Sequence, residues 1–359
     1  TALRGYFEVE ETVSDRDARA LIGVLYELTL RRRDLDYSEY IFTQGVDIDF
    51  ISTVKERSLD GVRIQAATIR QYETDTAPHL LGRVGDIWRE EWSYYRELGY
   101  NMNDTVGKDG VERAYETYLR GKPGVRVLEL TTSGKVVSST WEIEPEPGLN
   151  VILTLDNRLQ EKVKEVLSRT IENLESEDKE GGAIVIQDVR DGGILSMASY
   201  PDYDLATIYS DVARYNAALE DPLHPFVNRA TMGLYSPGST FKPLVAIAGL
   251  EEGITTPSER IRDTGYFTLP EEEKYPYGEY HPQCWYYRQY RGLHGMENLA
   301  DALRDSCNIY FFTIGHRLGI ERVEQYAALF GLGKSTGFEL GEYTGQVAGP
   351  ETSQKWGNT

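Results

Sequence analysis

Cysteine, long apolar runs and positive charge are all scarce in this 359-residue sequence. Its two cysteines, Cys284 and Cys307, are too few for a disulfide-rich scaffold. No run of about 18 apolar residues predicts a transmembrane helix, and no basic segment followed by an apolar stretch indicates a signal peptide. Only 38 Lys and Arg face 58 Asp and Glu, a net charge of −20. This balance excludes a general nucleic-acid binder and a basic membrane-surface binder.

The composition that remains is that of an ordinary globular protein. Hydrophobic residues make up 40% and charged residues 27% of the chain, which argues against wholesale disorder. The length suggests about two domains. An acidic, proline-rich break, EPEPG, occupies residues 144–148 and marks a boundary. We therefore predict one domain at residues 1–147 and a second at residues 148–359.

The sequence after this break mixes strand and helix patterns. An apolar alternation predicts a strand at residues 150–155, and Asp156 is a suitable N-cap for a helix at 158–174. Two further strands, at 182–188 and 193–199, flank a turn and predict a hairpin. Helical patterns follow. Together these elements predict the α+β fold class.

The segment most suggestive of chemistry is YSPGSTFKP, residues 235–243. Its Pro-Gly pair forces a tight entry, so that Ser239 stands at the start of a helix near backbone N–H groups. Lys242 follows three residues later, which places both side chains on one face. A serine becomes nucleophilic beside a base, and a desolvated lysine can be that base. The apolar residues 244–250 predict a dry site that lowers the pKa of Lys242.

The Ser-x-x-Lys pattern alone is not specific. It also occurs at Ser52–Lys55 and Ser176–Lys179, in charged segments that lack the Pro-Gly entry and the apolar continuation. A helix N-cap is the alternative role for Ser239. A relaxed phosphate-loop pattern, ALFGLGKS, lies at residues 328–335, but a helix is predicted where the buried strand should precede it. We therefore assign no nucleotide site.

A second pattern, Asp-Ser-Cys-Asn at residues 305–308, contains a hydroxyl and an amide two residues apart. It follows a helical run and precedes the apolar residues 309–314. From a bend between helices, Ser306 can relay a proton and Asn308 can grip a peptide group of a substrate. The alternative interpretation of this segment is a helix cap or turn.

Together these motifs resemble those of the class B penicillin-binding proteins, which are serine D,D-transpeptidases. Five segments carry the resemblance, at residues 104–121, 148–160, 182–204, 228–242 and 330–345. The Tyr-x-Pro-Gly-Ser-Thr-Phe-Lys and Ser-Cys-Asn forms favour the elongation-type subgroup, penicillin-binding protein 2. The resemblance implies an elongated N-terminal pedestal domain, followed by an incomplete transpeptidase domain of the penicillin-binding, β-lactamase-like fold.

The resemblance also implies an activity and roles for four residues. Ser239 attacks the carbonyl between the two terminal D-alanines of a peptidoglycan stem peptide, and neutral Lys242 takes its proton. Ser306 returns a proton to the leaving D-alanine, and Asn308 holds the substrate backbone. A second stem amine then forms the cross-link. β-Lactams are expected to acylate Ser239, and no cofactor is required.

The sequence departs from the family at both ends. Arg4-Gly5 is not followed by the Asp-Arg-x-Gly stretch usual early in the family, and no Lys-Ser-Gly or Lys-Thr-Gly motif occurs. We expect the chain to be part of a longer protein whose third motif follows residue 359. As given, the chain is then not expected to catalyse. The resemblance implies a periplasmic location and an anchoring membrane helix upstream.

The pedestal supports a second, non-catalytic hypothesis, which is compatible with the first. In the resembling family this domain docks a SEDS-type glycosyltransferase, and members also bind cell-shape scaffold proteins. A third interpretation, a β-lactamase or β-lactam sensor of the same fold, is disfavoured by the large N-terminal part. None of these hypotheses involves nucleic acid.

Four metal-ligand residues lie in or near the second motif. Asp263, Cys284 and His294 belong to a Tyr-rich insertion at residues 255–295, and Cys307 lies within the motif. One carboxylate, one imidazole and two thiolates suit tetrahedral zinc, although the spacing matches no zinc finger. Some elongation-type relatives bind zinc through Asp, His and the second-motif Cys, with a second carboxylate where we place Cys284. A Cys284–Cys307 disulfide or two unlinked thiols stay open as alternatives.

Overall fold

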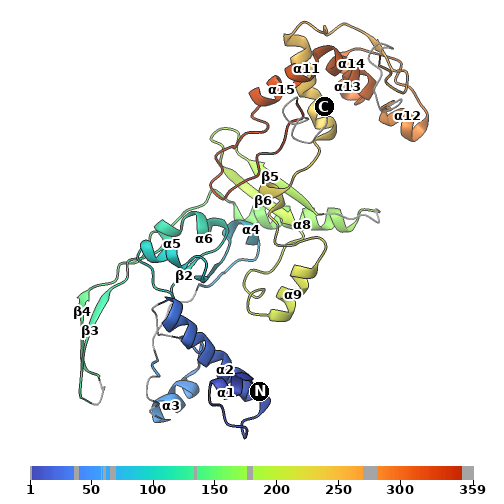
Figure 1. The fold of residues 1–359 in the computed structure, drawn as a ribbon. Coiled ribbons are helices and arrows are strands. Elements are labelled where there is room, and N and C mark those ends of the chain that lie inside the picture. The colour runs from blue at the N-terminus through green and yellow to red at the C-terminus, as the bar shows by residue number, and fades with distance from the viewer. Residues whose placement is uncertain are drawn as a thin grey trace. The chain divides into compact units, whose positions relative to one another are not determined.

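The computed structural model of the protein describes residues 2–35, 40–57, 59, 62–64, 70–132, 136–175, 181–269 and 281–349. The chain divides into two compact units, residues 1–173 with 185–226 and residues 174–184 with 227–359. Figure 1 shows the order of the elements along the chain. Among the described residues, no helix is long and apolar enough to cross a membrane. The boundary placed between residues 147 and 148 stays a prediction.

The elements up to residue 226 are short helices and strand pairs. In chain order they are α1 (Ala2–Tyr6), α2 (Asp15–Leu30), the π-helix η1 (Arg31–Leu35), α3 (Ile48–Arg57), α4 (Pro78–Leu81), β1 (Val84–Asp86), α5 (Trp92–Glu97), β2 (Thr105–Gly107), α6 (Gly110–Ala114), α7 (Glu116–Leu119), β3 (Val125–Leu130), β4 (Val136–Ile143), α8 (Asn157–Glu172), β5 (Gly182–Gln187), β6 (Ile194–Tyr200) and α9 (Val212–Glu220). The mixture of helices and strand pairs agrees with the predicted α+β class.

Strands of the described residues pair two by two: β1 with β2, β3 with β4, β5 with β6, and β7 (Ile261–Arg262) with β8 (Met296–Glu297). The β5–β6 pair confirms the hairpin predicted after the helix. The strand predicted at residues 150–155 is wrong. These residues alternate in burial as a strand does, but they bond to β6 through the Thr154 hydroxyl and the Asp156 amide instead of through a ladder.

Helix α8 begins at its predicted cap, because the carboxylate of Asp156 accepts two backbone N–H groups of the first turn. The buried face of α8 packs on β6, and Gln160 on that face is 1% exposed. Its amide donates to the carbonyls of Thr76 and Met197 at 2.9 Å, and its oxygen accepts from Ser196 and Met197. This fully bonded side chain links α8, β6 and the segment at Thr76.

The second unit contains the predicted chemical motifs. Its elements are α10 (Arg229–Met232), the 3₁₀ turn η2 (Gly238–Phe241), α11 (Lys242–Glu251), β7 (Ile261–Arg262), α12 (Trp285–Tyr290), β8 (Met296–Glu297), α13 (Leu299–Arg304), α14 (Asn308–Leu318) and α15 (Ile320–Leu329).

Helices α11 and α14 form the centre of this unit and pack closely. A Cβ at Gly249 of α11 would lie 2.8 Å from a methyl carbon of Ile314, a buried residue of α14, so the approach requires glycine. Lys242 is the first residue of α11 and Asn308 is the first residue of α14. The packing of the two helices therefore brings both motifs to one place.

Candidate active site

Ser239 lies in η2, immediately ahead of α11. Gly238 has a φ of +57°, which glycine adopts without strain, and the chain turns sharply after Pro237. The Ser239 side chain is exposed. Neither η2 nor α11 has a side-chain cap, since Pro237 and Phe241 occupy the cap positions. The N-cap interpretation of Ser239 is therefore wrong, and its hydroxyl instead accepts a hydrogen bond from Ser306.

The second motif forms the turn between α13 and α14. Ser306 has a φ of +53°, a left-handed conformation that is uncommon outside glycine. Such a backbone costs on the order of 1–3 kcal/mol and persists only where the surroundings hold it. Cys307, at the cap position of α14, is buried. The turn therefore directs its flanking side chains, Ser306 and Asn308, toward α11.

Hydrogen bonds join the two motifs into one constellation. The Ser306 hydroxyl donates to the Ser239 hydroxyl at 2.9 Å. Lys242 Nζ donates to the Ser306 carbonyl at 2.6 Å, to the Ser306 hydroxyl at 2.9 Å and to Asn308 Oδ1 at 2.7 Å. The sequence-predicted residues Ser239, Lys242, Ser306 and Asn308 are thus all brought together, with Ser306 as the bridge between the nucleophile candidate and the lysine.

Burial lowers the pKa of Lys242, because desolvation penalises its charged form. The nearby Cys284 and Cys307 oppose this shift more weakly. The next turn of α11, including Val245 and Ala246, is buried and apolar, as the sequence predicted. A lowered pKa increases the fraction of neutral lysine, which is the form that accepts a proton.

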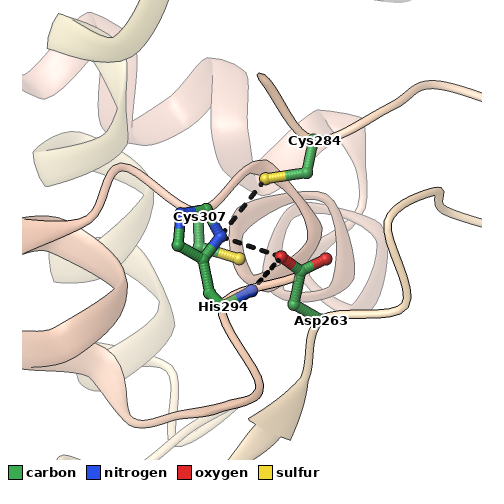
Figure 2. A group of neighbouring side chains, drawn as sticks. All are labelled: Asp263, Cys284, His294 and Cys307. Carbon is green, nitrogen blue, oxygen red and sulfur yellow. Dashed lines mark hydrogen bonds and ion pairs between the residues drawn. The ribbon is translucent and has the colours of Figure 1, made fainter. Parts of the chain in front are cut away.

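The four predicted metal ligands lie close together, as Figure 2 shows, and one of them, Cys307, belongs to the same turn as Ser306 and Asn308. Asp263 follows β7 and His294 precedes β8, and these two strands pair. Oδ2 of Asp263 lies 2.8 Å from His294 Nδ1, which lies 3.5 Å from the sulfur of Cys284. One donor atom from each of these residues and from Cys307 lies within 4.8 Å of every other.

This donor set fits zinc. Tetrahedral bonds of about 2.0–2.3 Å place ligand atoms roughly 3.3–3.8 Å apart, so small adjustments suffice. Both cysteines are free and buried. A hydrogen bond from Cys307 lowers the pKa of Cys284, and the same contact raises the pKa of Cys307. A thiolate already favoured at this position suits metal binding, which requires deprotonated sulfur.

Among the described residues, the other sequence patterns supply no side chain to these groups. Ser52–Lys55 lies on α3, with both residues exposed. Ser176–Lys179 lies outside the described residues. Residues 328–335 continue from α15, so a helix precedes this pattern, as predicted.

Sequence reasoning missed two residues that contact the second motif. The carbonyl of Gln283 accepts from the Asn308 amide at 3.1 Å, and the indole of Trp285 donates to the carbonyl of Asp305 at 3.1 Å. Neither residue belongs to a motif. The one signal that pointed to them was their position on either side of Cys284.

Comparisons with known proteins agree with this arrangement. The penicillin-binding protein dimerisation domain matches residues 9–153, and the penicillin-binding protein transpeptidase domain matches residues 182–357. Peptidoglycan D,D-transpeptidase MrdA of Escherichia coli K12 is 31% identical over 311 residues, which cover 84% of this chain and 45% of that protein.

Two solved structures resemble the chain. A chain of a peptidoglycan synthase complex that coordinates polymerization and crosslinking has a TM-score of 0.65 and 27% identity, covering 92% of this chain and 58% of that chain. Penicillin-binding protein PBP2 of Helicobacter pylori, solved in complex with MreC, has a TM-score of 0.73 and 21% identity. The match covers 97% of this chain and 65% of that chain. This second likeness concerns the fold.

The chain therefore belongs to the penicillin-binding proteins, with an N-terminal dimerisation domain followed by a transpeptidase domain. The family resemblance and the mixed helix and strand architecture predicted from the sequence are both confirmed. The chain spans about half the length of the curated relatives it matches, 45% in the case of the Escherichia coli protein.

Proposed function

We propose that the protein of which this chain is part is a peptidoglycan D,D-transpeptidase of the elongation type that works through a serine acyl-enzyme. The observation that carries the proposal is the hydrogen-bonded series from Ser239 through Ser306 to Lys242. It places an exposed hydroxyl in contact, through one relay, with a lysine of lowered pKa. This is the arrangement that a serine nucleophile needs.

The reaction follows from these contacts. Ser239 Oγ attacks the carbonyl between two terminal D-alanines, and its proton passes to neutral Lys242, directly or through the Ser306 hydroxyl. The Ser239 N–H contributes one donor to the oxyanion. As the C–N bond breaks, a proton returns through Ser306 to the leaving D-alanine. Asn308 holds the substrate backbone, and an amine of a second stem peptide then displaces Ser239 to form the cross-link.

Substitution of Ser239 tests the nucleophile. Ser239→Ala in the full-length protein should abolish covalent labelling by a fluorescent penicillin, measured on denaturing gels. Ser52→Ala is the matched control, because it removes the serine of the same four-residue pattern on the exposed face of α3 and should label normally. Labelling that survives Ser239→Ala contradicts the assignment, whereas rapid loss of the label from the unmodified protein would favour a β-lactamase.

The lowered pKa of Lys242 predicts how acylation depends on pH. Because neutral lysine is the base, the acylation rate should rise about tenfold per pH unit below the pKa of Lys242 and then level off. The midpoint should lie below the ordinary lysine value of about 10.4, since desolvation lowers the pKa. Stopped-flow labelling between pH 6 and about 10 measures the profile, with spontaneous probe hydrolysis subtracted. A rate that falls with rising pH over this range contradicts the role of Lys242.

We further propose that Asp263, Cys284, His294 and Cys307 hold one structural zinc ion. The support is their mutual distance, within 4.8 Å, and a donor set of one oxygen, one nitrogen and two sulfurs. Bound zinc would tie the insertion that carries Cys284 to the turn that carries Cys307. The chain's own residues perform the proposed acyl transfer, and this reaction does not need the ion.

Metal analysis tests the zinc site. Purified full-length protein should contain about one zinc per chain, and Cys307→Ala should lower its zinc affinity at least about tenfold. Cys284→Asp is the informative companion, because it replaces one anionic ligand with another and should retain the ion, whereas Cys284→Ala should not. Zinc-free unmodified protein, prepared without chelator, contradicts the site.

We also propose an extracytoplasmic location, with a membrane anchor, and docking to a SEDS-type glycosyltransferase and to a cell-shape scaffold protein. The likeness to a chain of a peptidoglycan synthase complex supports the first partner. The fold shared with a PBP2 solved in complex with MreC is compatible with the second. The dimerisation-domain match at residues 9–153 supplies the domain that would dock them.

Co-purification tests the docking role separately from catalysis. Tagged full-length Ser239→Ala protein, extracted from membranes, should retain a multi-span glycosyltransferase as well as unmodified protein does, because docking does not need the acyl-enzyme. Quantitative mass spectrometry of the tagged fractions measures it, with an untagged strain as the control. A tagged fraction without such a protein contradicts the proposed partner.

A further inference from the structure

Two residues of the Tyr-rich insertion, on either side of Cys284, bond to the turn that carries the second motif. The Gln283 carbonyl accepts from the Asn308 side chain at 3.1 Å. The Trp285 indole donates to the carbonyl of Asp305 at 3.1 Å. Two neighbouring positions of one segment thus reach both ends of the 305–308 turn.

Trp285 bonds to the part of the turn where its backbone is strained. Ser306 holds a left-handed φ of +53°, so the peptide groups on both sides must be held in place. The following carbonyl, that of Ser306, accepts from Lys242 at 2.6 Å, and the N–H of Cys307 donates to Ala302 at 2.9 Å. The carbonyl before Ser306, that of Asp305, accepts from the Trp285 indole.

The indole is itself kept in position by its neighbours. Trp285 is the first residue of α12, and its ring lies 5.6 Å from the ring of Tyr286 and 5.9 Å from that of His294, between centroids. The backbone just before it is anchored as well, because the Cys284 N–H donates to the carbonyl of Gly265 at 2.9 Å. The indole N–H of Trp285 is therefore held in place by its ring neighbours and by its backbone, and it can hold the carbonyl of Asp305 in turn.

Gln283 decides how the amide of Asn308 points. Its carbonyl can only accept, so Asn308 must present its NH₂ group there, and the Asn308 oxygen then faces Lys242 at 2.7 Å. The opposite amide orientation would set a carbonyl oxygen against Gln283 and an NH₂ group against the ammonium. The orientation of the proposed substrate-binding side chain is therefore determined by Lys242 together with Gln283, a residue outside both motifs.

We propose that residues 283–285 are a positioning clamp for the second motif, in which the Trp285 indole N–H holds Ser306 in its strained, proton-relaying conformation. Trp285 is a positioning residue, because it acts through the Asp305 carbonyl. The inference rests on the proposed acyl-enzyme function, since it assigns Trp285 a part in the acylation step. It predicts a kinetic effect from a side chain that is 40% exposed and lies outside every motif.

The test removes the N–H and keeps an aromatic ring. Trp285→Phe in the full-length protein should slow the acylation step by a fluorescent penicillin about fivefold, the effect of one lost neutral hydrogen bond, and leave reversible binding of the probe unchanged. Trp88→Phe is the matched control, because Trp88 is 54% exposed and belongs to the other compact unit. The acylation rate constant is calculated per folded molecule. If Trp285→Phe and the unmodified protein have the same constant, the proposal is overturned, whatever the thermal stability of the variant.

Two further measurements keep the outcome decisive. Replacing Trp285 by 3-benzothienylalanine removes the N–H without changing the shape, and this variant should show the same slowing even if Trp285→Phe does not fold; an unmodified rate overturns the proposal. Hydrogen exchange measured by mass spectrometry should be faster over residues 303–309 in either variant. An unchanged exchange rate there overturns the proposal. If unmodified protein is not acylated, the proposed function fails, and the exchange measurement alone decides the clamp.

Discussion

Lys242 holds the site together, since its ammonium group has three hydrogens and all three bond to the second motif. Two reach Ser306 and one reaches Asn308, across the junction of α11 and α14. Burial against the apolar start of α11 makes the charge costly, so each of these bonds is worth more than it would be in water. The same burial lowers the pKa of Lys242 and favours the neutral form that the chemistry needs. The charged form donates all three hydrogen bonds, whereas the neutral form keeps two hydrogens and gains the lone pair that accepts a proton, so one side chain takes the two roles in turn.

The turn at residues 305–308 is where the proposed catalytic and metal-ligand sets meet. Ser306 and Asn308 face Lys242, while Cys307 between them points the other way into the cluster with Asp263 and His294. Cys307 is joined by one peptide bond to Ser306 and by another to Asn308, so the two sets share one stretch of backbone. The left-handed φ of Ser306 persists only where the surroundings hold it, so this stretch depends on its contacts on both sides.

Local patterns were predictable where a single segment contains its own partners. The Asp156 cap bonds within its own first turn, and the hairpin of β5 and β6 joins neighbouring strands. The strand predicted at residues 150–155 failed because alternation sets which side chains are buried, whereas a strand also needs a partner ladder that this segment lacks in the described structure. The capping role considered for Ser239 failed for a related reason, since its hydroxyl is bonded by a distant residue, Ser306.

By itself, the sequence determined the chemistry available to this protein: a serine and a lysine on one helical face, a hydroxyl and an amide two residues apart, and four metal-ligand residues. It also determined the family, because those motifs occur together with their flanking segments. Only the tertiary structure decided that Ser306 bridges Ser239 to Lys242 and that the insertion grips the second motif through Gln283 and Trp285. These contacts join residues some 20 to 70 positions apart, many of them through backbone carbonyls that every residue possesses, and so no residue pattern encodes them.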